Sequence, residues 1–521
     1  MTGGEPPAGG TGTAGATAGI GRCALAVIAL ALVVRVGLFP FAENKHGDAP
    51  MRALIAEWMN LDPHAAADPR TYCQFGPLHT TLMRPFLGLD PVAPRSSRYL
   101  SLLAGVAVFF PFLRLARRLA APRFAPLAAL ALAVSPLHIQ ASITASSEAL
   151  YLLLMTACLE RLLAALDDGS LTTFAFAGLF ASLAAITRYD AWIDFPLVVA
   201  AAWLWSARST PGRWRGLVVF AAATALLPIV WIGWSARSTS DPFFFAHYIS
   251  NDHAHLAAAM TARWGALGAR LRQVGIWSLA FLATMGLPLL AGAVIALRRW
   301  FPRPGQQPLP ATAKIAIVAA LAPPALYLAK GLLLLSFEPL PRFALIPGAL
   351  LLPIAAEAAG TRWSARACRA ATVASAAIFS AVVLVVAWSG HARVWSGAES
   401  FAPITRLDSE DRALADYLRA HRQPRDRVLI EPLDFADIVI AHAARIPAPF
   451  TVSLSITRQP EPTLAATLSR TGADWLAVYD GPSGTWFPRF ASDWPASTLA
   501  FGHWRLLGTD SEMHRKEVLD E

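Results

Sequence analysis

The feature that most constrains this chain is a series of apolar segments, each about 20 residues long and separated by short polar loops. A helix of that length crosses the hydrocarbon core of a bilayer. Hydrophobic residues occupy 55% of the 521 positions and charged residues only 15%, whereas a soluble protein of this size carries about 25% charged residues. The pattern therefore predicts a polytopic α-helical membrane protein.

The apolar segments predict about eleven spans, which together form a transmembrane domain over 21–392. They lie near 22–41, 97–116, 124–140, 147–166, 172–188, 191–206, 216–235, 273–297, 312–335, 343–359 and 370–389. Residues 1–20 are mainly Gly, Thr, Ala and Pro without periodicity, and we expect a disordered cytoplasmic tail there.

The placement of arginine predicts how these spans are oriented. The formal net charge is +9, but only four lysines occur and many arginines lie at the ends of apolar runs. We interpret this charge as a topology signal and expect no nucleic-acid partner. Because short basic loops face the cytoplasm, the extracytoplasmic side receives the 43–96 loop, the turns near 141–146, 188–191 and 336–342, the 236–272 loop and the chain after 395.

The composition changes near 395, where the apolar segments end. Sequence patterns predict helices over 408–421, 435–442 and 462–469, and buried strands over 427–431 and 475–480. Helices that alternate with strands indicate a small extracytoplasmic α/β domain over 395–521. No glycine-rich phosphate loop accompanies these strands, so we do not assign nucleotide binding to this domain.

The first loop, 43–96, places one carboxylate at the mouth of a membrane segment. Asp48 precedes a short helix pattern whose apolar stripe, starting at Met51, suits the bilayer surface. A second such pattern follows within 73–90, and the two helices could frame a groove over the outer leaflet. Two interpretations of Asp48 stay open: a plain N-cap, or an acid that acts on a lipid-linked substrate.

Other polar residues lie at the same predicted face. Glu148, at the start of the fourth span, could bind an acceptor, help a metal or tune Asp48, or it could only begin a helix, where an acid suits the helix dipole. Arg188 is followed by Asp190 and Asp194. We favour an ion pair with one of these acids as structural glue over a direct substrate role for Arg188.

Arg342 comes at the outer end of a span, where a guanidinium could grip a phosphate with two hydrogen bonds or anchor the helix by snorkelling. The 236–272 loop contains HYISNDHAH, a faint zinc-like cluster that we interpret instead as a solvated loop or a mobile acceptor gate. We find no internal repeat, which weakens the hypothesis of a transporter built from inverted halves.

Taken together, these segments resemble the GT-C glycosyltransferases, especially the bacterial protein O-mannosyltransferase-like enzymes and the lipid A aminoarabinose transferases. The resemblance covers about residues 22–360 and rests on GDAPMRALIAEW, FGPLHTTLMRPFLGL, RYLSLLAGVAVFFPFLRLARRL, SPLHIQASITASSEALYLLL, GLFASLAAITRYDAWIDFPL and PRFALIPGALLLPIAA, in this order. It implies a bacterial inner-membrane enzyme with its active site on the periplasmic face. It also implies a polyprenyl-phosphate-linked sugar donor and a lipid, glycan or protein acceptor.

The resemblance further implies that Asp48 is the catalytic carboxylate, that Glu148 matches an acidic position in the second external loop, and that Arg342 matches a basic position associated with the lipid phosphate. The family often has a second acid beside the first-loop aspartate, where Ala49 stands here, and an aspartate where Glu148 stands. These departures leave the use of a divalent metal open.

The chemistry of such a transfer is consistent with this set of residues. Asp48 would take the proton of the acceptor hydroxyl as the hydroxyl attacks the anomeric carbon, which predicts inversion. The departing lipid phosphate needs charge stabilisation. The residues expected to bind substrate are Lys45, His46, Arg188, Arg237 and Arg342. The competing function is a transporter or a lipid-linked-sugar flippase, for which we would expect charged residues deep within the spans.

Overall fold

The computed structural model describes residues 12–45, 48–72, 75–89, 95–207, 212–302, 304, 307–388, 398–431, 436–447, 451–452, 463–481, 486–490, 494–495 and 498–508. These residues fall into two compact units. Unit 1 contains the chain up to Pro40, Leu102–Ser142 and Glu148–Pro403. Unit 2 contains Phe41–Ser101, Ile143–Ser147 and the chain from Ile404 onward.

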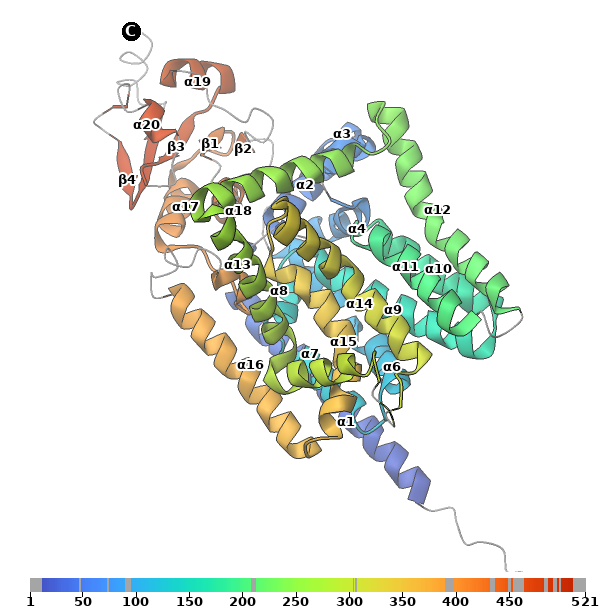
Figure 1. The fold of residues 1–521 in the computed structure, drawn as a ribbon. Helices are drawn as coiled ribbons and strands as arrows, with labels where there is room; N and C mark the ends of the chain where they lie inside the picture. Colours follow the sequence, from blue (N-terminus) through green and yellow to red (C-terminus); the bar gives the residue numbers. More distant parts are fainter. Residues whose placement is uncertain are drawn as a thin grey trace, which may run out of the picture. The chain divides into compact units, whose positions relative to one another are not determined.

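Unit 1 is helical throughout its described residues (Figure 1). Its helices are α1 Gly12–Leu38, α6 Phe109–Leu119, α7 Ala125–Val134, α8 Pro136–Ile143, α9 Ser147–Asp168, α10 Leu171–Ala185, α11 Ala191–Ala202, α12 Arg213–Thr239, α13 Phe244–Arg298, α14 Ala311–Ala329, α15 Leu345–Gly360 and α16 Ala365–Trp388. α5, Tyr99–Ala107, begins in unit 2 and continues into unit 1. Short π-helical turns, Trp203–Ala207 and Lys330–Leu334, extend α11 and α14.

Among the described residues, eight helical segments are long and apolar enough to cross a bilayer, and the bent pair α7–α8 makes a ninth. The prediction of a polytopic helical membrane protein is therefore confirmed. The count of eleven spans exceeds this number because two of the predicted spans correspond to shorter apolar helices, Leu171–Ala185 and Ala191–Ser206. The predicted tail is also too long, since α1 begins at Gly12.

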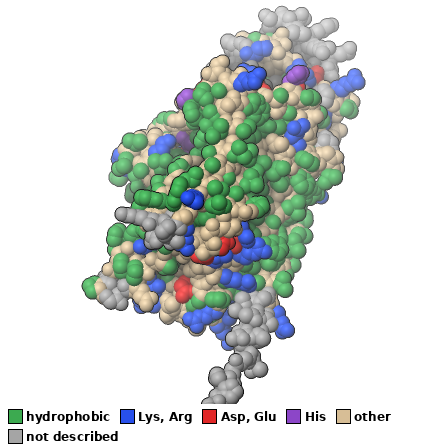
Figure 2. Space-filling model, turned by 90° about the vertical axis from the view of Figure 1, so that its right-hand side faces the viewer, with side chains coloured by type: hydrophobic (Ala, Val, Ile, Leu, Met, Phe, Trp, Pro, Cys, Tyr) green, Lys and Arg blue, Asp and Glu red, His purple; other side chains and the backbone are tan. Residues whose placement is uncertain are grey.

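The exposed surface of unit 1 carries many large apolar side chains. On α12, for example, Ile229 is 64% exposed, and on α16 Val385 is 67% exposed. Figure 2 shows hydrophobic side chains over much of one face of the molecule. Large apolar side chains exposed along helices of this length fit contact with lipid tails rather than with water.

The bend between α7 and α8, 61°, is stabilised by a buried arginine. Pro136 has no backbone N–H, so the helix cannot continue its hydrogen bonds through this point. Arg35 of α1 donates to the carbonyl of Ala133 at 3.1 Å, to Nδ1 of His138 at 2.7 Å and to Oγ of Ser142 at 3.2 Å. One side chain thus holds α1, the end of α7 and the start of α8 together.

The predicted 236–272 loop is wrong for most of its length. α13 starts at Phe244 and runs to Arg298, with breaks at Gly265 and Gly286, whose φ values are +68° and +70°. Positive φ is favourable only for glycine at such positions. The segment is polar enough to suggest a loop, but from Phe244 onward its residues are helical on both sides of the break at Gly265.

Unit 2 joins the first loop to the C-terminal domain. The first loop forms α2 Ala49–Leu61, α3 Pro63–Ala67 and α4 Pro77–Leu87, so the two predicted helices are present. The middle of the apolar stripe of α2, Leu54 and Ile55, is buried in protein instead of lying on a lipid surface, whereas Trp58 is 37% exposed. The alanines of α2 pack against Met83 and Leu87 of α4, while Leu54 packs against Ile438 of α18 (Ala436–Ala443).

The C-terminal part forms a five-stranded mixed sheet in the order β2-β1-β3-β5-β4 (Figure 1). The strands are β1 Val428–Ile430, β2 Thr451–Val452, β3 Trp475–Tyr479, β4 Leu499–Phe501 and β5 Trp504–Gly508; the further helices are α17 Ser409–His421, α19 Leu464–Thr471 and α20 Phe487–Phe490. β1 pairs in parallel with β2 and β3, and β5 pairs antiparallel with β3 and β4. Every predicted element of this domain is present, and β2, β4, β5 and α20 were not predicted.

Candidate functional site

The polar residues of unit 1 converge on one buried carboxylate. Glu148, in the first turn of α9, has a side chain only 4% exposed. Arg188 donates from Nη1 to Oε1 of Glu148 at 2.6 Å, and Nε of Arg342 lies 3.6 Å from the same oxygen. Arg188 also donates from Nε to Oδ2 of Asp190 at 2.7 Å. We call these four residues, Glu148, Arg188, Asp190 and Arg342, the arginine–acid cluster.

The cluster is assembled by three segments that end or begin helices. Arg188 lies in the turn between α10 and α11, Asp190 occupies the N-cap position of α11, and Arg342 belongs to the short 3-10 helix Pro341–Ala344 before α15. Polar groups collect at such ends because the first N–H groups and last carbonyls of a helix need partners outside it. The sequence predicts an ion pair of Arg188 with Asp190 or Asp194, and the structure shows the one with Asp190; the second bond, to Glu148, was not predicted.

Aromatic side chains surround the cluster. The guanidinium carbons of Arg188 and Arg342 lie 5.7 and 5.6 Å from the ring centre of Phe343, and that of Arg188 lies 6.0 Å from Tyr151. The Tyr327 hydroxyl donates to Asp190. Ring faces attract guanidinium groups within about 6 Å, and these rings also keep water away from the ion pairs. The sequence alone gave no signal for these rings: Tyr151 lies on α9 with Glu148, Phe343 follows Arg342 in the 3-10 helix, and Tyr327 comes from α14.

The electrostatics of Asp190 show how strongly the arginine acts. Burial alone would raise the pKa of Asp190, but the guanidinium of Arg188 and the hydroxyl of Tyr327 outweigh burial and hold that pKa below its ordinary value. Asp190 is therefore a carboxylate at neutral pH. Asp194, the alternative predicted partner of Arg188, instead accepts a hydrogen bond from Tyr151 at 3.2 Å.

Asp48 lies in unit 2, at the N-cap position of α2, and is partly buried. Its side chain makes no capping hydrogen bond to the helix. The start of α2 is fixed by Asn44 instead, which donates to the carbonyl of Ala49 at 3.1 Å and accepts from the N–H of Ala145 at 2.8 Å. The plain N-cap interpretation of Asp48 therefore lacks the bond that defines such a cap.

The other predicted substrate-binding residues do not belong to the arginine–acid cluster. Lys45 pairs with Asp408 at 3.0 Å within unit 2. Arg237 is exposed in the last turn of α12 and forms no ion pair with any described residue. His46 lies outside the described residues.

The donor atoms needed for a metal site are not gathered in the described part of the chain, where no group of three or more His, Cys, Asp and Glu residues has that arrangement. In the HYISNDHAH segment, His247 contacts Asp241 at 2.9 Å, while His253 packs on Phe337 at 4.7 Å between ring centres. Glu148 and Asp190 hold guanidinium groups. Their carboxylates therefore do not fit a divalent-cation site, and we derive no step through a metal.

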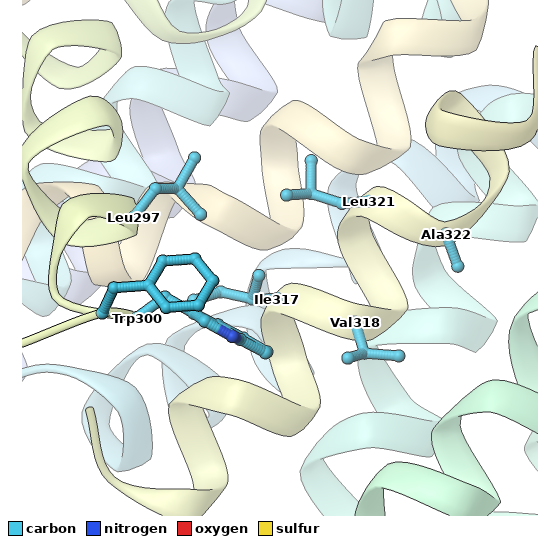
Figure 3. A pocket seen from close by; sticks show the side chains of 7 residues that line it. Leu297, Trp300, Ile317, Val318, Leu321 and Ala322 are labelled. Atoms are coloured by element: carbon cyan, nitrogen blue, oxygen red, sulfur yellow. The ribbon is translucent and has the colours of Figure 1, made fainter. Parts of the chain in front are cut away.

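Unit 1 also contains an apolar cavity of about 440 Å³ that carries no chemistry of its own (Figure 3). It lies between the end of α13 and the middle of α14, and Trp300 reaches into it from one side. Its lining residues are Leu297, Trp300, Phe301, Ile317, Val318, Leu321 and Ala322. No acid, base or nucleophile lines it, so the arginine–acid cluster and Asp48 remain the candidates for chemistry.

Comparison with known proteins identifies the fold. No protein-family model and no curated protein matches the chain. The structure is similar to that of ArnT from Cupriavidus metallidurans, with a TM-score of 0.61 and 18% identity over 94% of this chain and 98% of that one. It is also similar to the archaeal oligosaccharyltransferase AglB from Archaeoglobus fulgidus, solved with an inhibitory peptide and a dolichol-phosphate, with a TM-score of 0.51 and 15% identity over 87% of this chain and 69% of that one. The chain therefore has the fold that ArnT and AglB share, the GT-C glycosyltransferase fold.

Proposed function

We propose that this protein is a membrane glycosyltransferase that moves a sugar from a polyprenyl-phosphate donor to an acceptor hydroxyl. The observation that carries the proposal is the similarity of fold to ArnT over nearly the full length of both chains. A dolichol-phosphate is bound in the AglB structure, which supports a lipid phosphate as one ligand class. The acceptor is a lipid, a glycan or a protein.

We assign the general base to Asp48. A general base must reach the incoming hydroxyl with a carboxylate oxygen, and Asp48 stands at the start of α2 with a partly buried side chain that does not cap the helix. The bonds of Asn44 hold the start of that helix without help from Asp48. Direct attack on the anomeric carbon with Asp48 as base gives inversion, and no second nucleophilic carboxylate is needed.

We assign stabilisation of the departing phosphate to the arginine–acid cluster, with Arg342 as the contacting residue. Arg342 approaches Glu148 at 3.6 Å, whereas Arg188 is held by two short ion pairs of 2.6 and 2.7 Å. The guanidinium group of Arg342 can grip a phosphate with two parallel hydrogen bonds. Glu148 then orients the arginines instead of acting as an acid. Lys45 and Arg237 would contribute charge, and His46 would contact the substrate.

We place the reaction at the extracytoplasmic face of a bacterial plasma membrane. The arginine bias of the short loops supports this orientation. A lipid-carried donor is delivered within the membrane, so the enzyme needs no glycine-rich phosphate loop for a nucleotide-sugar.

A donor panel tests the proposed activity. Purified protein in sealed proteoliposomes is given radiolabelled polyprenyl-phosphate sugars and mixed lipid, glycan and peptide acceptors. We expect label to appear on an acceptor with release of free polyprenyl phosphate for at least one donor. Label that enters the vesicle lumen still attached to its lipid, without transfer, would replace the proposal with a flippase.

A further inference from the structure

In unit 2, the C-terminal domain grips the segment that precedes α2. The N–H of Glu43 donates to the carbonyl of Thr405 at 2.7 Å, and the Thr405 hydroxyl donates back to the carbonyl of Glu43 at 2.6 Å. The Glu43 carboxylate accepts from the N–H of Leu407 and from Arg412 of α17. Lys45 then pairs with Asp408 at 3.0 Å. Five contacts thus fix the chain within five residues of Asp48.

The same domain also holds the other end of α2. Leu54 packs on Ile438 of α18, with Met51 beside them. Near the end of α2, Oε1 of Glu57 lies 3.4 Å from Nε2 of His442. The Glu57 side chain is 7% exposed and that of His442 only 4%. Both side chains are buried, so loss of either one leaves the other as a buried polar group without its neighbour.

The ring of His442 lies close to two acids, Glu57 of α2 and Asp437 of its own helix. Among the described residues, neither ring nitrogen of His442 has a hydrogen-bond partner, and the nearest carboxylate oxygen of Glu57 lies 3.4 Å from Nε2. A buried histidine that packs for stability alone would normally satisfy its ring nitrogens with hydrogen bonds. Its position is explained if its task is to face the carboxylate of α2.

We propose that the C-terminal domain positions the first-loop helix α2, with His442, Arg412 and Glu57 as positioning residues. The proposal rests on the proposed role of Asp48, which starts that helix. Because a shift of about 1 Å in a reacting group can cost about 100-fold in rate, a helix clamped at both ends holds a base better than a loop would. Loss of this positioning should therefore lower kcat and leave the affinity for the donor unchanged.

The test uses the full-length protein in lipid nanodiscs and the donor that the panel identifies. The variants are His442→Gln, Glu57→Gln, their combination, and Arg412→Gln, chosen because the Arg412 side chain is 45% exposed and exposed ion pairs contribute little to stability. Asp416→Asn is the matched control, because Asp416 pairs with Arg419 on the exposed face of the same domain.

We expect each of the three single positioning variants to lower kcat about 10-fold while KM for the donor changes less than twofold. We expect the His442–Glu57 double variant to lose no more than either single, since both remove one contact, and Asp416→Asn to match wild type. A rise in KM at constant kcat, or kcat within twofold of wild type in Arg412→Gln and His442→Gln, would overturn the inference.

Asp48→Asn separates this inference from the proposed function. If Asp48→Asn is inactive while the positioning variants keep wild-type kcat, the positioning role is refuted and the assignment of Asp48 as the base stands. If Asp48→Asn transfers sugar at the wild-type rate, the base assignment fails, and the positioning role fails with it.

Discussion

Removal of Arg188 gives a direct measure of what holds unit 1 together. In Arg188→Met, Glu148 and Asp190 lose the guanidinium that now lies 2.6 and 2.7 Å from them, although their side chains are only 4% and 14% exposed. Loss of one partner from a buried ion pair costs about 3–5 kcal/mol, because the remaining charge stays in a poorly solvated place. We expect Arg188→Met to lose a free energy of unfolding in that range.

The assay is unfolding by SDS in mixed micelles, followed by tryptophan fluorescence. Arg419→Met is the control, because its ion pair with Asp416 is 50% exposed on each side and exposed pairs contribute only about 0–1 kcal/mol. The double variant Arg188→Met/Glu148→Gln should recover part of the loss, since the neutral amide no longer leaves a charge buried. If Arg188→Met costs no more than Arg419→Met, the cluster is not the buried network described above.

Three further predictions concern packing, pH and substrate affinity. Gly292→Ala in α13 places a Cβ 2.3 Å from the carbonyl oxygen of Ala355 in α15. We therefore expect it to lower the free energy of unfolding in SDS by about 1–3 kcal/mol. In Gly275→Ala on the same helix the Cβ meets nothing within 4 Å, so the free energy of unfolding should rise by up to about 1 kcal/mol. Burial raises the pKa of Asp437 to about 6, so the folded state binds this proton more tightly than the unfolded state does. The stability of the folded state therefore falls as pH rises from about 4 to about 6. We expect Asp437→Asn to raise the melting temperature at pH 8 but not at pH 4. Arg342→Ala should weaken donor binding about 10-fold in a nanodisc binding assay. Arg342→Lys should bind the donor with an affinity between those of wild type and Arg342→Ala, because lysine keeps the charge but cannot make two parallel hydrogen bonds. Equal donor affinity of wild type and both variants would contradict a phosphate contact.

The helices of unit 1 were largely predictable because their signal is local. A run of about 20 apolar residues has few alternatives to a spanning helix, and the helices and strands of the C-terminal domain show their periods within a few residues. The main failure is the 236–272 segment. Its polar composition suggested a loop, whereas it is helical from Phe244 onward with a break at Gly265.

The candidate site was predicted only in part. Arg188 and Asp190 are two residues apart, so their pairing could be expected from the sequence. The partners that come from distant segments could not: Arg188 meets Glu148 across 40 positions, and Tyr327 meets Asp190 across 137. The apolar stripe of α2 suggested a lipid surface, because periodicity shows that a face is buried but not what buries it.

The central claim is that Asp48 removes the acceptor proton during transfer from a lipid phosphate. The most direct measurement compares single-turnover transfer and donor affinity for wild type and Asp48→Asn in nanodiscs. Because a general base contributes about 10²–10⁴-fold, we expect transfer by Asp48→Asn to fall by that factor while donor affinity changes less than twofold. Transfer at the wild-type rate, or a loss explained entirely by weaker donor binding, would contradict the account.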